Sequence, residues 1–124
     1  MITGLDHVRL GGPLGCEEQA RAFYGGLLGL REIDQPPLLA ARGGVWWELA
    51  DGRQLHIGAD ADFAAAAKAH PALALADGSA LDALAERLAD AGCEPRWDSE
   101  LPGARRFYLN DPFGNRLELI AWDR

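Results

Sequence analysis

Three histidines and one glutamate of this sequence form a candidate set of metal ligands. They are His7, His56, His70 and Glu118, the last of which interrupts an apolar run near the C-terminus. Imidazole and carboxylate groups are common ligands of divalent ions, and zinc, nickel, manganese, cobalt and iron(II) are all compatible with such a set. If these side chains converge on one sheet face, they predict a divalent-metal site.

Glu118 requires a positively charged partner in any interpretation. Side chains alternate along a strand, so Leu117 and Leu119 share one face of the last predicted strand, while Glu118 points to the other. A buried carboxylate without a partner costs several kcal/mol or more. The partner could be a metal ion, Arg116 two positions along the same face, or Arg9.

The elements that would position these residues occur twice in the same order, strand, helix, strand, strand, strand. Apolar alternation and helical spacing predict the first set at 4–10, 17–28, 30–34, 44–49 and 53–59. They predict the second set at 70–75, 81–91, 93–97, 107–109 and 115–120. We expect Gly29 and Gly92 to end the helices and a Ser79/Asp82 capping box to begin the second one. His7 and His70 are 63 positions apart and His56 and Glu118 are 62 apart, so the histidines fall at related places in the repeat.

The repeat predicts an α+β fold built of two βαβββ modules in tandem. Module one covers about 1–60, module two about 70–124, and an alanine-rich connector spans 60–69. At 124 residues the chain suits a single domain with its own hydrophobic core.

Composition excludes several function classes. The net charge of −7 argues against a nucleic-acid or anionic membrane surface, since both partners require a cationic footprint. No apolar run reaches the length of a membrane span, and the N-terminus lacks the order of a signal peptide, so we expect a cytoplasmic protein. Cys16 and Cys93 have neither metal-site nor redox spacing, and we interpret them as buried or idle thiols.

Several segments together resemble the vicinal oxygen chelate superfamily, which includes glyoxalase I, extradiol dioxygenases, methylmalonyl-CoA epimerase, fosfomycin-modifying enzymes and bleomycin resistance proteins. The segments are Leu5-Asp6-His7-Val8, Ala22-Phe23-Tyr24, Leu27-Leu28-Gly29-Leu30, His70-Pro71-Ala72-Leu73 and, most specifically, Asp111-Pro112-Phe113-Gly114-Asn115-Arg116-Leu117-Glu118. The resemblance implies a cupped mixed sheet around a central cavity, a divalent metal ion and a homodimer. It places the metal ligands at His7, His56, His70 and Glu118.

The same face is expected to bind a small substrate that is anionic or aromatic. Arg9 and Arg116 share the inferred cavity face with His7 and Glu118, although neutralising nearby acids is an equally good role for them. Alternation also turns one member of each of two aromatic pairs inward, Trp46 or Trp47 and Phe107 or Tyr108. The predicted substrate-binding residues are therefore Arg9, Trp46, Trp47, Tyr108 and Arg116.

Two functions remain open at this point. In an enzyme, the metal would bind vicinal oxygens of the substrate in lyase, isomerase, thiol transferase or oxygenase chemistry, with Glu118 as the candidate catalytic base. His56 stands where glyoxalase I has a carboxylate, which argues against a proton shuttle between two carboxylates. The alternative is a metal-indifferent protein that sequesters drugs, as bleomycin resistance proteins do.

Overall fold

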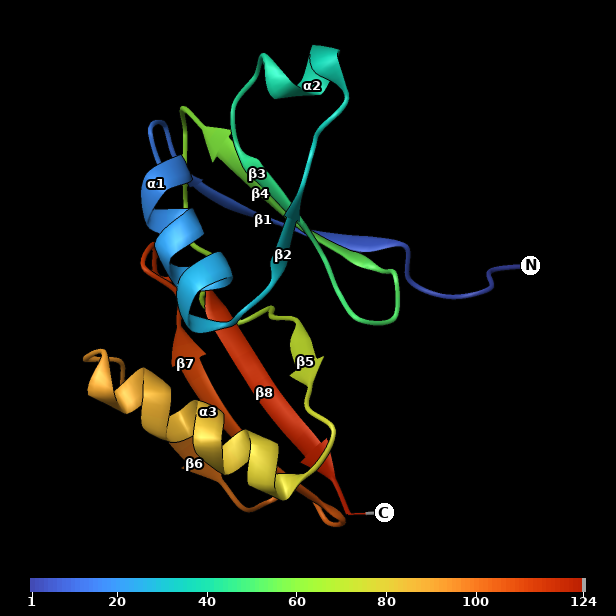
Figure 1. The fold of residues 1–124 in the computed structure, drawn as a ribbon, viewed down its shortest axis with the longest axis vertical. Helices are drawn as coiled ribbons and strands as arrows, with labels where there is room; N and C mark the ends of the chain where they lie inside the picture. The colour runs from blue at the N-terminus through green and yellow to red at the C-terminus, as the bar shows by residue number, and fades with distance from the viewer. Residues whose placement is uncertain (124) are drawn as a thin grey trace. The chain divides into compact units, whose positions relative to one another are not determined.

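The protein consists of two βαβββ modules in an α+β fold, as the sequence predicts. The structure is a computed structural model and describes residues 1–123 (Figure 1). The chain divides into two compact units, Met1–Ala65 and Ala66–Arg124. The division lies inside the predicted connector 60–69.

Unit 1 contains a four-stranded sheet in the order β1-β4-β3-β2. β1 pairs with β4 in parallel, and the other neighbours are antiparallel. The elements of this unit are β1 (His7–Pro13), α1 (Glu17–Ala20), the π-helical segment η1 (Arg21–Leu27), β2 (Arg31–Ile33), α2 (Pro37–Ala40), β3 (Val45–Glu48) and β4 (Gln54–Asp60).

Unit 2 repeats this arrangement with the sheet order β5-β8-β7-β6, in which β5 and β8 are parallel. Its elements are β5 (Ala72–Ala74), α3 (Gly78–Asp90), β6 (Arg96–Asp98), β7 (Ala104–Asn110) and β8 (Arg116–Trp122). In Figure 1, α3 crosses one face of this sheet. The opposite face of the sheet is left for polar side chains.

The predicted first helix is present, but only its first turn is α-helical. The π-helical part carries the two glycines that the sequence places late in the helix, and Gly29, with φ of +73°, ends it as predicted. A glycine inside a helix costs stability, and a close approach to the neighbouring sheet is one reason for it. A Cβ on Gly25 would lie 3.7 Å from Trp47 Nε1 of β3, which is an ordinary contact, so the approach is close without requiring glycine.

The start of α3 differs from the prediction. Asp77, rather than Ser79, is the N-cap, and its side chain accepts a hydrogen bond of 2.8 Å from the backbone N–H of Ala80. Asp77 is extended, with φ −159° and ψ 175°, as a capping residue must be. The capping-box prediction was wrong because Ser79 already lies inside the first turn.

Apolar side chains of each sheet face its helix. In unit 1, Trp47 is fully buried and packs against Tyr24 of η1, with ring centroids 5.1 Å apart. In unit 2, the residues of the helix-facing layer are Phe107, Leu109, Leu117 and Leu119 from the sheet and Leu81 and Leu88 from α3, each at most 2% exposed. This alternation puts Glu118 on the face away from α3.

The turn between β7 and β8 is held by its own side chains. Asp111 Oδ1 accepts hydrogen bonds of 2.9 Å from the backbone N–H groups of Phe113 and Asn115, and Gly114 supplies a φ of +89°. The buried Asn115 donates from Nδ2 to Asp111 Oδ2 and accepts from the backbone N–H of Ala66. These bonds fix the start of β8, and therefore the position of Glu118 along it.

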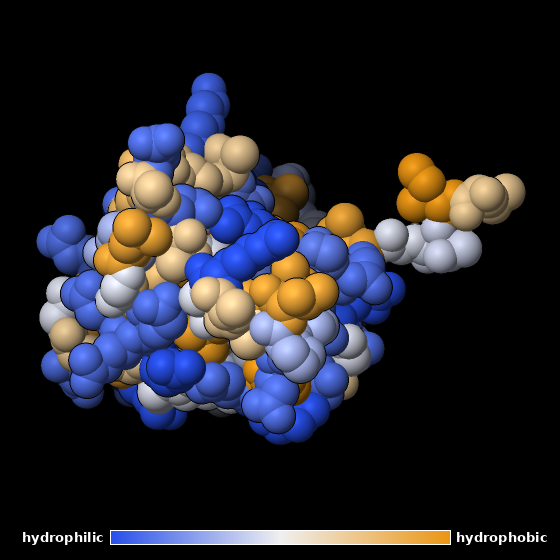
Figure 2. Space-filling model, turned by 90° about the horizontal axis from the view of Figure 1, so that it is seen from above, coloured by the Kyte–Doolittle hydropathy of each residue, from blue (hydrophilic) through white to orange (hydrophobic). Residues whose placement is uncertain are grey.

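Two segments outside the predicted elements are notable. The short helix α2 was not predicted; Pro37 begins it, a position where the missing N–H has no cost. Figure 2 shows the segment before β1 standing clear of the surface, and Met1, Ile2 and Leu5 are highly exposed. Within residues 1–123, no helix has both the length and the apolar composition needed to cross a bilayer.

Candidate functional site

Glu118 and His70 contact each other on the polar face of the unit 2 sheet. Glu118 is only 5% exposed, and its Oε1 lies 3.0 Å from His70 Nε2. His70 Nδ1 lies 2.8 Å from the backbone carbonyl oxygen of Lys68, which can only accept, so Nδ1 carries a proton. In a neutral imidazole, Nε2 then presents a lone pair to a carboxylate oxygen. Two acceptors at 3.0 Å require a positive charge, either a second proton on His70 or a cation between the two groups.

Within unit 2, the arginine partner of Glu118 is Arg106 of β7, and the predicted alternative Arg116 was wrong. Arg106 Nη1 lies 3.4 Å from Glu118 Oε2, and Arg106 Nη2 lies 3.4 Å from Asp98 Oδ1. The pKa of Asp98 is lowered, first by a hydrogen bond from the Glu100 backbone N–H and then by the charge of Arg106. Arg106 therefore divides its charge between two carboxylates.

Tyr108 lies beside Glu118 on the same face, because the two residues are partners in the β7–β8 pairing. The guanidinium carbon of Arg116 lies 4.1 Å from the Tyr108 ring centroid, and that of Arg106 lies 5.3 Å from it. The His70 ring meets the tyrosine edge-on at 5.4 Å. Tyr108 thus faces the candidate site, whereas its neighbour Phe107 is buried in the core.

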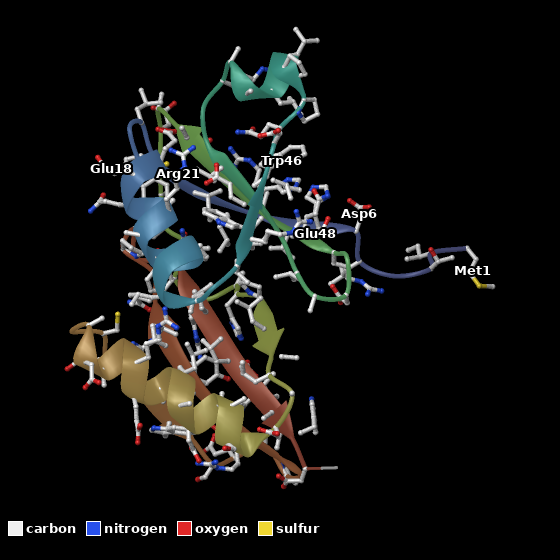
Figure 3. All side chains as sticks on the ribbon, viewed as in Figure 1. Met1, Asp6, Glu18, Arg21, Trp46 and Glu48 are labelled. Carbon is white, nitrogen blue, oxygen red and sulfur yellow. The ribbon has the colours of Figure 1, made fainter. Side chains whose placement is uncertain are left out.

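In unit 1, three aromatic rings form a stack on the face away from the helix. The His56 ring is parallel to that of Trp46, at a centroid distance of 3.7 Å and an angle of 4°, and lies 4.3 Å from the His7 ring at 19°. Because β4 lies between β3 and β1, His56 is the middle ring. Trp46 is labelled in Figure 3. Of the two predicted tryptophans, Trp46 therefore lies with the histidines, and Trp47 lies in the core.

Both histidines of the stack have a hydrogen-bond partner. His56 Nε2 lies 2.8 Å from Gln54 Oε1, and His7 Nδ1 lies 2.8 Å from Asp6 Oδ1. The pKa of His56 is lowered to about 4, chiefly because burial penalises its charged form and further because of the charge of His7. His56 is consequently neutral near pH 7.

The stack affects how His7 and His56 could bind a metal ion. An imidazole lone pair lies in the plane of its ring, and metal–nitrogen bonds are about 2.0–2.1 Å long. Nearly parallel rings 4.3 Å apart do not direct their lone pairs at one point. As they lie, only one of the two rings can bind a given ion. No three His, Cys, Asp or Glu side chains within residues 1–123 are grouped closely enough to hold a metal together.

Arg9 is occupied by an ion pair across unit 1. Its two terminal nitrogens lie 2.7 and 3.2 Å from the carboxylate oxygens of Asp60, which raises the pKa of Arg9 and lowers that of Asp60. The guanidinium lies directly over Gly58, where any Cβ would collide with it. Glycine at this position therefore permits the ion pair.

Comparison with known proteins identifies the family. A family model described as the Glyoxalase/Bleomycin resistance protein/Dioxygenase superfamily matches residues 17–119. The chain belongs to this superfamily. A glyoxalase family protein from Bacillus anthracis has 41% sequence identity and a TM-score of 0.92, with 98% of this chain and 97% of that chain covered. No curated protein sequence matches the chain.

Two more distant structures share the superfamily fold. The fosfomycin resistance protein FosX from Listeria monocytogenes has 22% identity and a TM-score of 0.77, with 98% of this chain and 94% of that chain covered. Lactoylglutathione lyase from Agrobacterium tumefaciens has 18% identity and a TM-score of 0.75, with coverage of 97% and 94%. At these identities the likeness extends to the fold alone.

In this member of the superfamily, two polar residues beside the candidate ligands were missed from the sequence. Arg106 has the same parity as Tyr108 on β7, and Gln54 has the same parity as His56 on β4. Strand alternation alone could have placed both on the polar face. The sequence holds no signal for their contacts. Only the register between β7 and β8 shows which of the eleven arginines meets Glu118.

Proposed function

We propose that the protein is a divalent-metal-dependent enzyme that acts on a small molecule through vicinal oxygens. The observation that carries this proposal is the His70–Glu118 pair. Histidines that bind metals usually donate their second ring N–H to a backbone carbonyl or carboxylate, and His70 donates to the carbonyl of Lys68. Its free nitrogen then faces Glu118, so a cation between them would remove the contact between two acceptors.

The proposed ligands in unit 2 are His70 and Glu118, and the candidate ligands in unit 1 are the imidazoles of His7 and His56. His7 is the better placed of the two, since its Nδ1–H is held by Asp6 and its Nε2 remains available. His56, the other predicted ligand, donates from Nε2 to Gln54 and lies between two rings, so its role in this proposal is to support His7. It would become a fourth ligand only by leaving the stack.

A bound divalent ion would act as a Lewis acid on substrate oxygens. Of the chain's own groups, Glu118 is the proposed proton acceptor, and Arg106 Nη1 lies 3.4 Å from its Oε2. Tyr108, its partner in the β7–β8 pairing, would line the space beside it. Among proteins with the same fold, the Glu-to-Gln mutant of FosX, 21% identical to this chain, is described in complex with Mn(II) and 1S,2S-dihydroxypropylphosphonic acid, a vicinal diol. That complex supports the proposed class of ligand.

The test is metal binding by matched variants. Titration of chelator-treated protein with Mn(II), Ni(II), Zn(II), Co(II) or anaerobic Fe(II) should give one site in the wild type. We expect Glu118→Gln and His70→Ala to weaken binding roughly 100-fold, as loss of a charged or imidazole ligand does. Glu32→Gln is the control, because it makes the same change in a surface ion pair with Arg21. His56→Phe, which keeps a flat ring in the stack, should retain the metal.

Equal metal affinity in Glu118→Gln and the wild type would reject the proposed site. Assays of the metal-loaded protein with hemithioacetals, with fosfomycin and a thiol, and with catechols distinguish the lyase, transferase and oxygenase classes. Tight binding of bleomycin that survives metal removal, without turnover of any of these compounds, would instead identify a drug-sequestering protein.

A further inference from the structure

Arg116 of β8 has no acidic partner among residues 1–123. Arg96, opposite Tyr108 on β6, also has none, but it donates to Asn110 Oδ1 at 3.2 Å. The Arg116 guanidinium lies 4.1 Å over the ring of Tyr108. Among residues 1–123, no carboxylate oxygen lies within ion-pair distance of it, and its Nε is buried without a hydrogen-bond partner. Asp98 is close enough for its pKa to be lowered by the charge of Arg116, but the two form no ion pair.

By contrast, two arginines of β7 are ion-paired. Arg106 contacts both Asp98 and Glu118, and Arg105 pairs through two nitrogens with Asp82 at 2.7 and 3.0 Å. In unit 1, Arg9 is paired with Asp60 in the same way. Arg9 is therefore already neutralised, and of the two arginines expected to bind an anion only Arg116 has its charge available.

The position of Arg116 is fixed although its charge is free. Its backbone N–H donates to the carbonyl of Ala66 at 2.8 Å. Arg116 is the first residue of β8 and directly follows the hydrogen-bonded turn between β7 and β8. Stacking on Tyr108 holds the planar guanidinium in one orientation, so little conformational entropy remains to be lost on binding.

We propose that Arg116, stacked on Tyr108, binds an oxyanion of the substrate, a carboxylate or a phosphonate. This inference rests on the proposed function, because it takes the face that carries Glu118 as the substrate face. The guanidinium fork matches both oxyanions through paired N–H···O bonds. The substrate would then be a small organic anion whose charged group binds at Arg116, on the same strand face as Glu118 and two residues before it.

The experiment measures anion binding without metal, so that it is independent of the metal site. Benzoate and phenylphosphonate are the two charged probes, and benzamide is the uncharged probe of similar shape. Each is titrated into chelator-treated protein while arginine Nε–H signals are followed by NMR. We expect at least one anion to bind about tenfold more tightly than benzamide and to shift the Arg116 Nε–H signal. Whichever anion binds more tightly identifies the oxyanion.

Three variants separate recognition from general charge effects. Arg116→Gln should lose about tenfold in anion affinity and leave benzamide binding unchanged. Arg116→Lys keeps the charge but not the stacked fork, so it should also weaken anion binding, and it serves if the glutamine variant does not fold. Arg42→Gln is the control, because Arg42 is exposed and has no ion pair among residues 1–123.

Anion affinity that is unchanged in both Arg116 variants, or equal affinity for anions and benzamide in the wild type, would overturn the inference. These outcomes say nothing about metal binding. Conversely, if the metal site is rejected, Arg116 should still bind anions in preference to benzamide. The two proposals can therefore fail separately.

Discussion

At the scale of single residues, the folded protein controls the charge of His56. The ring lies between Trp46 and His7, with Gln54 on its Nε2, and it faces the charges of Asp6 and Arg9 as well. Burial is the largest cause of its low pKa, because water can no longer solvate an imidazolium. A neutral His56 leaves the buried middle ring of the stack uncharged near pH 7.

This predicts that acid destabilises the metal-free protein partly through His56. Its pKa falls from 6.5 in an ordinary environment to about 4 in the fold, so the unfolded chain binds the proton first. The stabilisation is complete above pH 6.5 and is lost as pH falls from there towards 4, by at most about 3 kcal/mol. Urea unfolding at pH 7.5 and pH 4.5 should show a larger loss for the wild type than for His56→Phe.

Other acidic groups titrate equally in both proteins, so the difference between the two losses isolates His56. Identical losses in the wild type and His56→Phe would show that the stack does not control its protonation. Trp46 fluorescence offers a second readout, since an imidazolium in contact with the indole ring should quench it.

At the scale of elements, the start of α3 gives a direct test of which residue caps the helix. Removing the Asp77 side chain leaves the Ala80 N–H without its acceptor, and capping losses of this kind cost about 1 kcal/mol. Asp77→Ala should therefore lower the free energy of unfolding by about that amount. Ser79→Ala, which removes the residue first predicted to cap the helix, should change it little. A larger loss of unfolding free energy in Ser79→Ala than in Asp77→Ala, measured by urea unfolding, would instead support the predicted capping box.

The sequence predicted best those elements in which apolar residues recur at a regular strand or helix spacing. Alternation in β8 placed Glu118 opposite Leu117 and Leu119, and the 3.6-residue spacing of α3 placed Leu81 and Leu88 in the core. Local hydrogen-bonding choices were predicted poorly, because Asp77 and Ser79 are both good caps and the chain decides between them by backbone geometry. The π-helical η1 has no sequence signal of comparable strength.

In the candidate site, too, strand alternation was predicted well and contacts between side chains were predicted poorly. Strand parity was enough to assign His56 and Glu118 to polar faces. It left the choice within each aromatic pair open, and the structure turns Trp46 rather than Trp47, and Tyr108 rather than Phe107, to the polar face. Which arginine meets Glu118 depends on register between strands that are distant in sequence, so Arg106 was missed. The occupation of Arg9 by Asp60 depends on the bare backbone at Gly58, a steric condition that no periodicity reveals.

At the scale of the whole molecule, metal binding should appear as thermal stability. An ion that binds only the folded chain stabilises it by RT ln(1 + [L]/Kd), about 2.7 kcal/mol at a hundredfold excess over Kd. For a chain of 124 residues, each kcal/mol shifts the melting temperature by a few degrees, so the expected rise is roughly 10 °C.

The ligand variants decide whether that rise comes from the proposed site. Glu118 is buried against His70 and Arg106, so Glu118→Gln removes the negative charge that a divalent ion requires while preserving the shape of the side chain. With roughly 100-fold weaker binding, the same metal concentration should stabilise this variant by only about 0.4 kcal/mol, so calorimetry should show a far smaller rise in its melting temperature. Glu32→Gln, altered in an exposed ion pair, should respond as the wild type does. A rise of equal size in Glu118→Gln would place the stabilising ion elsewhere on the surface, since unfolding linkage counts every ion that the folded chain binds.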